Sequence, residues 1–125
     1  MAALASFARI CVSDLDAGLK ALTASGVTDV RLRFGHPASL QLALVGEVLV
    51  LAGSDEVIEP FRSTDVTVIV DDLDGAVAAA LSASAEIIRE PAEQQVGRNA
   101  TVAFPGGPII EYVQWNEETR TVAGL

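Results

Sequence analysis

Residues 12–16 are Val-Ser-Asp-Leu-Asp, and residues 70–74 are Val-Asp-Asp-Leu-Asp. The two copies lie 58 residues apart (70 minus 12), close to half of the 125-residue chain. The similarity extends outward, because residues 66–69 follow the extended pattern of residues 8–11, and Ile88-Arg89 repeats Val30-Arg31. A match of this length indicates a duplicated structural unit, although two copies are too few for a solenoid.

Each half predicts the same order of elements. The segments at 7–12 and 65–70 are rich in β-branched residues and predict strands. Ser13 and Asp71 are expected to cap the helices that follow, since short polar side chains satisfy free backbone N–H groups at helix starts. Three further strands are expected after each helix, at 30–34, 40–45 and 47–52 in the first half and at 86–90, 99–104 and 109–115 in the second.

This order predicts an α+β fold made of two βαβββ modules within one domain, residues 1–125. The modules are expected at about 5–53 and 63–116, joined by a linker at 54–62 that contains Pro60. Residues 105–108, Pro-Gly-Gly-Pro, predict a tight turn between the last two strands.

Composition and charge exclude several classes of function. The chain has 8 Lys+Arg against 17 Asp+Glu, a formal net charge of −9, which argues against nucleic acid and anionic membrane surfaces as partners. The longest apolar run, residues 40–53, contains Gln41 and Glu47 and falls short of the roughly 20 apolar residues of a spanning helix. Without a basic segment ahead of an apolar one, no signal peptide is expected, so we expect a soluble, cytoplasmic protein.

The sole cysteine, Cys11, excludes an internal disulfide and any site built from several thiolates.

The doubled βαβββ order, the (Ser/Asp)-Asp-Leu-Asp helix start and Gly-Gly-Pro-Ile-Ile-Glu-Tyr-Val at 106–113 resemble the vicinal oxygen chelate superfamily. That group includes glyoxalases, bleomycin-resistance proteins, fosfomycin-resistance enzymes and extradiol dioxygenases. The resemblance covers roughly residues 7–115. It implies that the modules form an open barrel around a ligand cleft, and that the protein is a homodimer.

The resemblance also implies four metal-ligand positions, which fall on Phe7, Val50, Asp65 and Glu111 in this sequence. Two of these side chains are hydrocarbons that cannot bind a metal. The sole histidine, His36, is expected in a loop away from these positions. We therefore expect no cofactor and a lost metal site; a divalent ion held weakly by Asp65 and Glu111 is the less favoured alternative.

Glu111 is the main candidate for chemistry. Strand alternation places Ile110 and Tyr112 on one face and Glu111 on the other, so Glu111 points into the cleft if the Ile110 face packs on a helix. There it could be a general base, a ligand-binding carboxylate or a residual metal ligand, or it could simply pair with an arginine.

Four other residues complete the predicted ligand-binding set. Asp65 could share the cleft with Glu111, although a solvated role at the start of its strand is favoured. Arg9 is expected to pair with Glu111 or Asp65, or to bind an anionic substrate. Phe7 and Trp115 could stack on a flat ligand, although aromatic side chains more often fill a core.

Three functions are consistent with the sequence, and whether the protein is an enzyme stays open. The favoured one is a small-molecule binding protein similar to bleomycin-resistance proteins, in which Arg9 and Glu111 orient the ligand. The first alternative is a superfamily enzyme of the lyase, isomerase or dioxygenase type that uses Glu111 as base or residual metal ligand. The second is a non-catalytic structural or partner-binding subunit.

Overall fold

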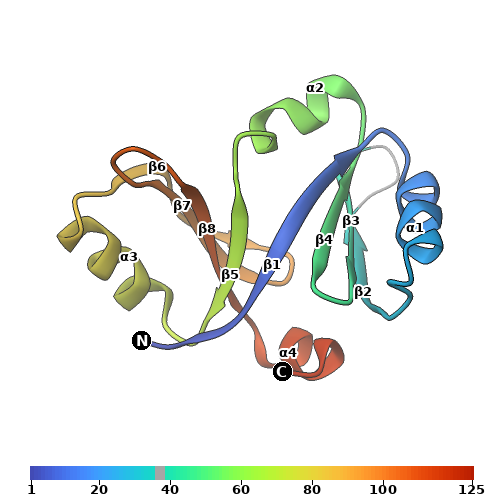
Figure 1. Cartoon of the computed structure of the whole chain (residues 1–125). Coiled ribbons are helices and arrows are strands. Elements are labelled where there is room, and N and C mark those ends of the chain that lie inside the picture. The colour runs from blue at the N-terminus through green and yellow to red at the C-terminus, as the bar shows by residue number, and fades with distance from the viewer. Residues whose placement is uncertain (36–38) are drawn as a thin grey trace. The chain divides into compact units, whose positions relative to one another are not determined.

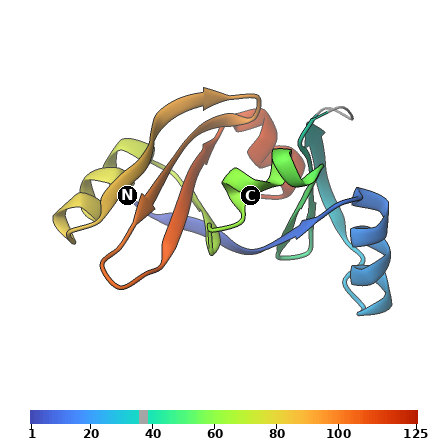
Figure 2. The same cartoon turned by 90° about the horizontal axis from the view of Figure 1, so that it is seen from above.

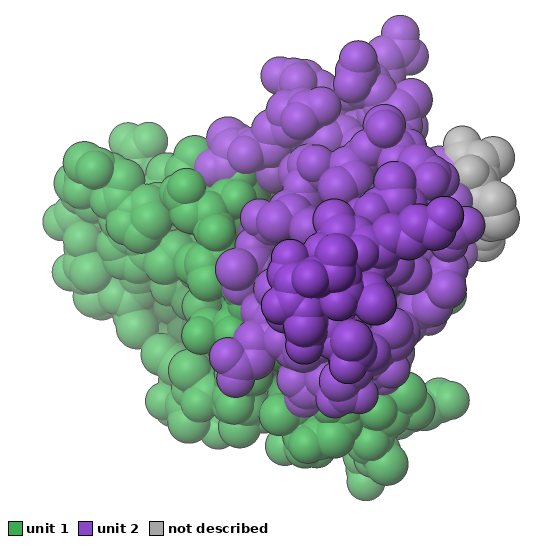
Figure 3. Space-filling model, turned by 45° about the vertical axis from the view of Figure 1, so that its right-hand side comes forward, with its two compact units in different colours: residues 1–7, 64–125 green, residues 8–63 purple. Residues whose placement is uncertain are grey.

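The computed structural model describes residues 1–35 and 39–125. His36, Pro37 and Ala38 therefore lie outside the described residues, and with them the loop predicted around the sole histidine. The chain divides into two compact units: unit 1 comprises residues 1–7 and 64–125, and unit 2 comprises residues 8–63 (Figure 3). Strand β1 (Ala3–Val12) contributes residues to both units.

Unit 2 contains the first βαβββ module. After β1 come α1 (Leu15–Ala24), β2 (Val30–Gly35), β3 (Gln41–Val45), β4 (Val48–Ala52), α2 (Asp55–Ile58) and a 3₁₀ helix at Glu59–Phe61. The strands are ordered β2-β3-β4-β1 (Figure 1). β1 runs parallel to β4, and the other neighbours are antiparallel.

Unit 1 repeats this arrangement. Its elements are β5 (Val66–Val70), α3 (Leu73–Ser82), β6 (Glu86–Gln94), β7 (Gly97–Ala103), β8 (Ile109–Trp115) and α4 (Glu117–Ala123). The order is β5-β8-β7-β6, with β5 parallel to β8. The duplicated βαβββ pattern and the α+β fold class predicted from the sequence are both confirmed.

In each unit a helix covers one face of the sheet (Figures 1 and 2), which we call the helix face. In unit 2, Leu15 of α1 packs with Val45 and Val50. In unit 1, Leu73 and Val77 of α3 pack with a cluster that includes Tyr112. Each fully buried side chain of this kind contributes about 1.5–3 kcal/mol. These contacts therefore hold each helix on the sheet of its own module.

The helix caps lie one residue later than predicted. Asp14 and Asp72 are the N-caps: the Asp14 carboxylate accepts from the Ala17 N–H, and the Asp72 carboxylate accepts from the Gly75 N–H, both at 3.1 Å. An extended cap residue places its carboxylate over the third residue of the helix, which Ser13 and Asp71 are too far upstream to reach. The Asp71 carboxylate instead accepts from the Ala2 N–H at 2.7 Å.

The segment predicted as a plain linker, residues 54–62, is helical over most of its length. Ser54 caps α2 by accepting from the Val57 N–H, and Ile58 is buried. A corresponding helix, α4, follows β8 and begins at Asn116, which accepts from the Thr119 N–H at 2.9 Å. Each module is therefore followed by a short helix that the sequence pattern does not predict.

The remaining differences concern strand ends. β6 continues to Gln94, and its pairing with β7 is irregular on both sides of Arg89. The predicted turn at 105–108 is present, with Gly106 and Gly107 at positive φ.

None of the helices described in residues 1–35 and 39–125 is long and apolar enough to cross a membrane.

Candidate functional site

Glu111 lies on the face of the unit 1 sheet that α3 does not cover. Its neighbours in β8, Ile110 and Tyr112, pack with Ala80 of α3 on the helix face. Because successive strand residues point to opposite faces, the Glu111 side chain projects from the other one. The alternation predicted from the sequence is therefore confirmed.

Two side chains from neighbouring strands hold the Glu111 carboxylate. The Thr67 hydroxyl of β5 donates to Oε1 at 2.9 Å. The Asn99 amide of β7 donates to Oε2, also at 2.9 Å. Strand register explains the arrangement, since Thr67 and Thr101 both lie directly beside Glu111, one on each side.

We call Glu111, Thr67, Asn99 and Thr101 the Glu111 cluster. Thr67 and Thr101 are two of the three buried polar residues among those described, and Glu111 is half-buried. An ionised carboxylate only accepts hydrogen bonds, and here each oxygen has its own donor. The two donors fix the plane of the carboxylate.

Asp65 is held at the start of its strand. Its exposed carboxylate accepts from the Ile109 N–H at 2.8 Å, and its own N–H donates to the Ile109 carbonyl at 2.8 Å. These contacts fasten the beginning of β5 to the beginning of β8. They favour the strand-start role over a place beside Glu111.

Phe7 and Trp115 stack on each other. Their ring centroids are 6.0 Å apart and the planes are inclined by 29°. The two residues are only 1% and 6% exposed. This pairing favours the core role for both rings over stacking on a flat ligand.

Arg9 lies in unit 2, where its Nη2 donates to the Phe61 carbonyl at 3.3 Å. Strand pairing makes Arg9 the counterpart of Thr67, since Arg9 lies beside Leu49 in unit 2 as Thr67 lies beside Glu111 in unit 1. Its contact with a ligand stays a prediction.

The same register corrects one of the four implied metal-ligand positions. The counterpart of Glu111 is Leu49, whereas Val50 faces α1 and is completely buried there. Phe7 and Leu49 offer no donor atom, so the residues present do not fit the four-ligand site of the superfamily. Within residues 1–35 and 39–125, no three His, Cys, Asp or Glu side chains are grouped so that they could hold a metal.

The sequence pattern does not single out the threonines of the cluster. Thr67 lies in a run of β-branched residues that predicts only a strand, and Asn99 lies in a segment that likewise predicts only a strand. The available signal was weak: Thr67 is the polar residue of an otherwise aliphatic strand. Which strand lies beside it depends on pairing that spacing alone does not give.

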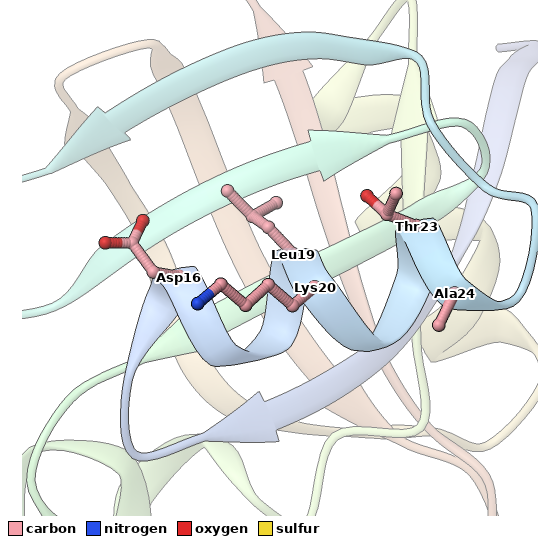
Figure 4. A pocket seen from close by; sticks show the side chains of 5 residues that line it. All are labelled: Asp16, Leu19, Lys20, Thr23 and Ala24. Carbon is pink, nitrogen blue, oxygen red and sulfur yellow. The ribbon is translucent and has the colours of Figure 1, made fainter.

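A depression of about 500 Å³ lies along α1. Its lining residues are Asp16, Leu19, Lys20, Thr23 and Ala24 (Figure 4). All five belong to one helix, so no second element converges on a bound molecule there. We do not treat this depression as a candidate site.

No family model matches the chain, and no curated protein matches it. Solved structures do. An uncharacterized protein from Methanosarcina mazei is 36% identical, with a TM-score of 0.84 and coverage of 94% of this chain and 96% of that one.

Methylmalonyl-CoA epimerase from Mycobacterium tuberculosis matches with a TM-score of 0.69 at 16% identity, covering 97% of both chains. A Streptomyces coelicolor methylmalonyl-CoA epimerase variant in complex with 2-nitronate-propionyl-CoA matches with a TM-score of 0.68 at 17% identity, covering 89% of this chain and 93% of that one. At such identities the likeness shows the fold alone. The chain belongs to the same protein family as the uncharacterized Methanosarcina mazei protein, and it has the fold of the methylmalonyl-CoA epimerases.

Proposed function

We propose that the protein binds a small molecule at the Glu111 cluster, and that it does so without a metal ion. The observation that carries this proposal is the fixed carboxylate, held at 2.9 Å by Thr67 and by Asn99 on the sheet face that α3 does not cover. Glu111 would accept a hydrogen bond from a donor group of the ligand.

The comparison between the modules supports a functional role for this polarity. The counterparts of Asn99, Thr101 and Glu111 in unit 2 are Leu42, Leu44 and Leu49. The same fold is thus built with leucines at these three positions in one module. Because replacing both partners of a hydrogen bond by apolar groups of the same shape can be neutral or even stabilising, stability alone does not account for the polar groups in the other module.

A ligand screen against Glu111→Gln tests the proposal. The substitution preserves the shape of the side chain but presents an NH₂ group to the Thr67 or Asn99 donors. Glu118→Gln, at an exposed position on α4, is the matched control. We expect a ligand that raises the melting temperature of the wild type and of Glu118→Gln, with at least about tenfold weaker binding, or about 1.4 kcal/mol, to Glu111→Gln.

Equal binding to all three proteins would place the ligand elsewhere. If no ligand is found in a broad metabolite and antibiotic panel, the structural or partner-binding alternative becomes the better explanation.

Metal independence has its own test. Untagged protein purified without chelator should carry no stoichiometric divalent ion, even after loading with Ni, Zn, Mn or Fe(II). A bound ion that disappears in Glu111→Ala would contradict this part of the proposal.

An isomerase is the second candidate, favoured by the shared fold with the methylmalonyl-CoA epimerases. In such a reaction the Glu111 carboxylate would take a proton from the carbon next to a thioester carbonyl, leaving an enolate, and return a proton to that carbon. Methylmalonyl-CoA is the first probe to use. Incubation in D₂O should introduce deuterium at this carbon with the wild type and with Glu118→Gln, and at least about 100-fold more slowly with Glu111→Gln; unchanged exchange in Glu111→Gln would exclude Glu111 as the base.

A further inference from the structure

Unit 2 contains a cavity of about 320 Å³ at the end of its sheet. It lies where β1 and β4 end and where α1 and α2 begin (Figure 1). Polar side chains line much of it, among them Ser13, Asp14, Gln41 and Ser54. Its volume is at the lower end of the range for small-molecule sites, about 300–1,000 Å³.

In unit 1 a side chain occupies the corresponding place. The register of β1 with β4 pairs Val12 with Ala52, and the register of β5 with β8 brings Gln114 to the equivalent position. The Gln114 Oε1 accepts a hydrogen bond of 2.8 Å from the Leu73 N–H, the first residue of α3. A carboxamide thus bridges the last strand and the helix.

Ala52 is too short to make this bridge in unit 2, and it lines the cavity instead. The corresponding helix N–H belongs to Leu15, which also lines the cavity. The first N–H groups of a helix have no partner within the helix. Among the described residues, the Leu15 N–H makes no hydrogen bond of the kind that Leu73 makes with Gln114.

We propose that this cavity binds a small neutral compound through a carboxamide group, whose oxygen accepts from the Leu15 N–H as Gln114 Oε1 accepts from Leu73. Two independent observations support it: the cavity itself, and the carboxamide that already occupies the equivalent place in the other module. The site is separate from the Glu111 cluster and does not rest on the function proposed there.

Local charge selects a carboxamide over a carboxylate. Asp14 lines the cavity, and its carboxylate already caps α1 by accepting from the Ala17 N–H. A second carboxylate would be repelled, whereas a carboxamide NH₂ can donate to Asp14 or to the Ser13 and Ser54 hydroxyls. Unit 1 follows the same rule, because the neutral Gln114 accompanies the cap residue Asp72.

Acetamide is the probe, and the backbone amide NMR signals of Leu15 and Leu73 are the readout. In the wild type, acetamide should shift the Leu15 signal and leave Leu73 unchanged. Gln114→Ala should acquire the same response at Leu73, which sets the acetamide concentration to use. Ala52→Gln should abolish the response at Leu15, and acetate should shift Leu15 several-fold less than acetamide.

Stability gives a second measurement that does not depend on Gln114→Ala folding. Ala52→Gln should melt at a higher temperature than Ala52→Leu, because both side chains fill the cavity but only glutamine can accept from the Leu15 N–H. The proposal is overturned if Ala52→Gln melts no higher than Ala52→Leu. It is equally overturned if acetamide leaves Leu15 unmoved at a concentration that shifts Leu73 in Gln114→Ala or, where that variant does not fold, at the highest concentration the wild type tolerates.

Discussion

The two modules share a fold but differ on one face of their sheets. On the helix face both are apolar, with Leu15 and Val50 in unit 2 and with Leu73 and Val77 in unit 1. On the opposite face, unit 2 carries Leu42, Leu44 and Leu49 where unit 1 carries Asn99, Thr101 and Glu111, and it carries Arg9 where unit 1 carries Thr67.

The difference separates what the fold requires from what it leaves open. An apolar helix face is needed in both modules, because it supplies the buried area that stabilises each helix on its sheet. The opposite face tolerates either composition. A duplicated module can therefore keep leucines at positions where the other copy acquires polar groups suited to a ligand.

Exchanging counterparts across this face should produce the largest effect. Leu44 is completely buried and lies at the position that Thr101 occupies in unit 1. Leu44→Thr removes buried hydrocarbon and places a hydroxyl in an apolar setting, so we expect the free energy of unfolding to fall by about 3 kcal/mol or more. Urea unfolding measures the change.

The reciprocal exchange is the control. Thr101→Leu adds volume without burying a new polar group, and its setting is already polar and paired, so we expect a loss of about 1 kcal/mol. Equal losses in the two variants would mean that the two faces do not differ in the way described.

A smaller effect should follow from the helices. Gly18 of α1 and Ala76 of α3 are counterparts in the 58-residue repeat. Ala76 is buried against its sheet, and Ala76→Gly should cost about 2 kcal/mol through lost helix propensity and one lost methyl contact. Thermal or urea unfolding measures it.

Gly18→Ala is the matched test in unit 2. A Cβ at Gly18 would lie 3.1 Å from Cγ2 of Val12 and 3.2 Å from Cγ1 of Val50. This crowding offsets most of the gain in helix propensity, about 1 kcal/mol, so the stability should change little. If Gly18→Ala instead raised the free energy of unfolding by the full gain of about 1 kcal/mol, the Val12 and Val50 side chains would have to move aside at little cost.

The repeat made most of the fold predictable, since two similar halves constrain each other. The strand at 109–115 was predicted with its observed bounds, and the starts of α1 and α3 were predicted within one residue. The short helices α2 and α4 were missed because they lack an apolar period. Their signal was a cap residue followed by two acids, Ser54-Asp55-Glu56 and Asn116-Glu117-Glu118.

The site was only partly predictable. Alternation along one strand fixes which way Glu111 points, and that much follows from spacing. Its partners, Thr67 and Asn99, come from two other strands. Their contact with Glu111 depends on strand register, because a slip of one residue sends every side chain to the other face. A slip of this size also separates Val50, the position expected from the sequence, from Leu49, the observed counterpart of Glu111.

The smallest expected effect concerns Tyr112, the helix-face neighbour of Glu111. Burial raises the pKa of the Tyr112 phenol above its ordinary value, because desolvation disfavours the charged form. The unfolded chain therefore releases this proton at a lower pH than the folded protein does. Stability due to this group is complete below about pH 10 and declines as the pH rises through the folded pKa.

Tyr112→Phe should lose less stability than the wild type between neutral and strongly alkaline pH. Tyr112 is the sole tyrosine, so the ultraviolet absorbance of tyrosinate reports its titration directly. An alkaline loss of the same size in Tyr112→Phe would assign the effect to other groups, and would remove the phenol as a distinguishing feature of the helix face of unit 1.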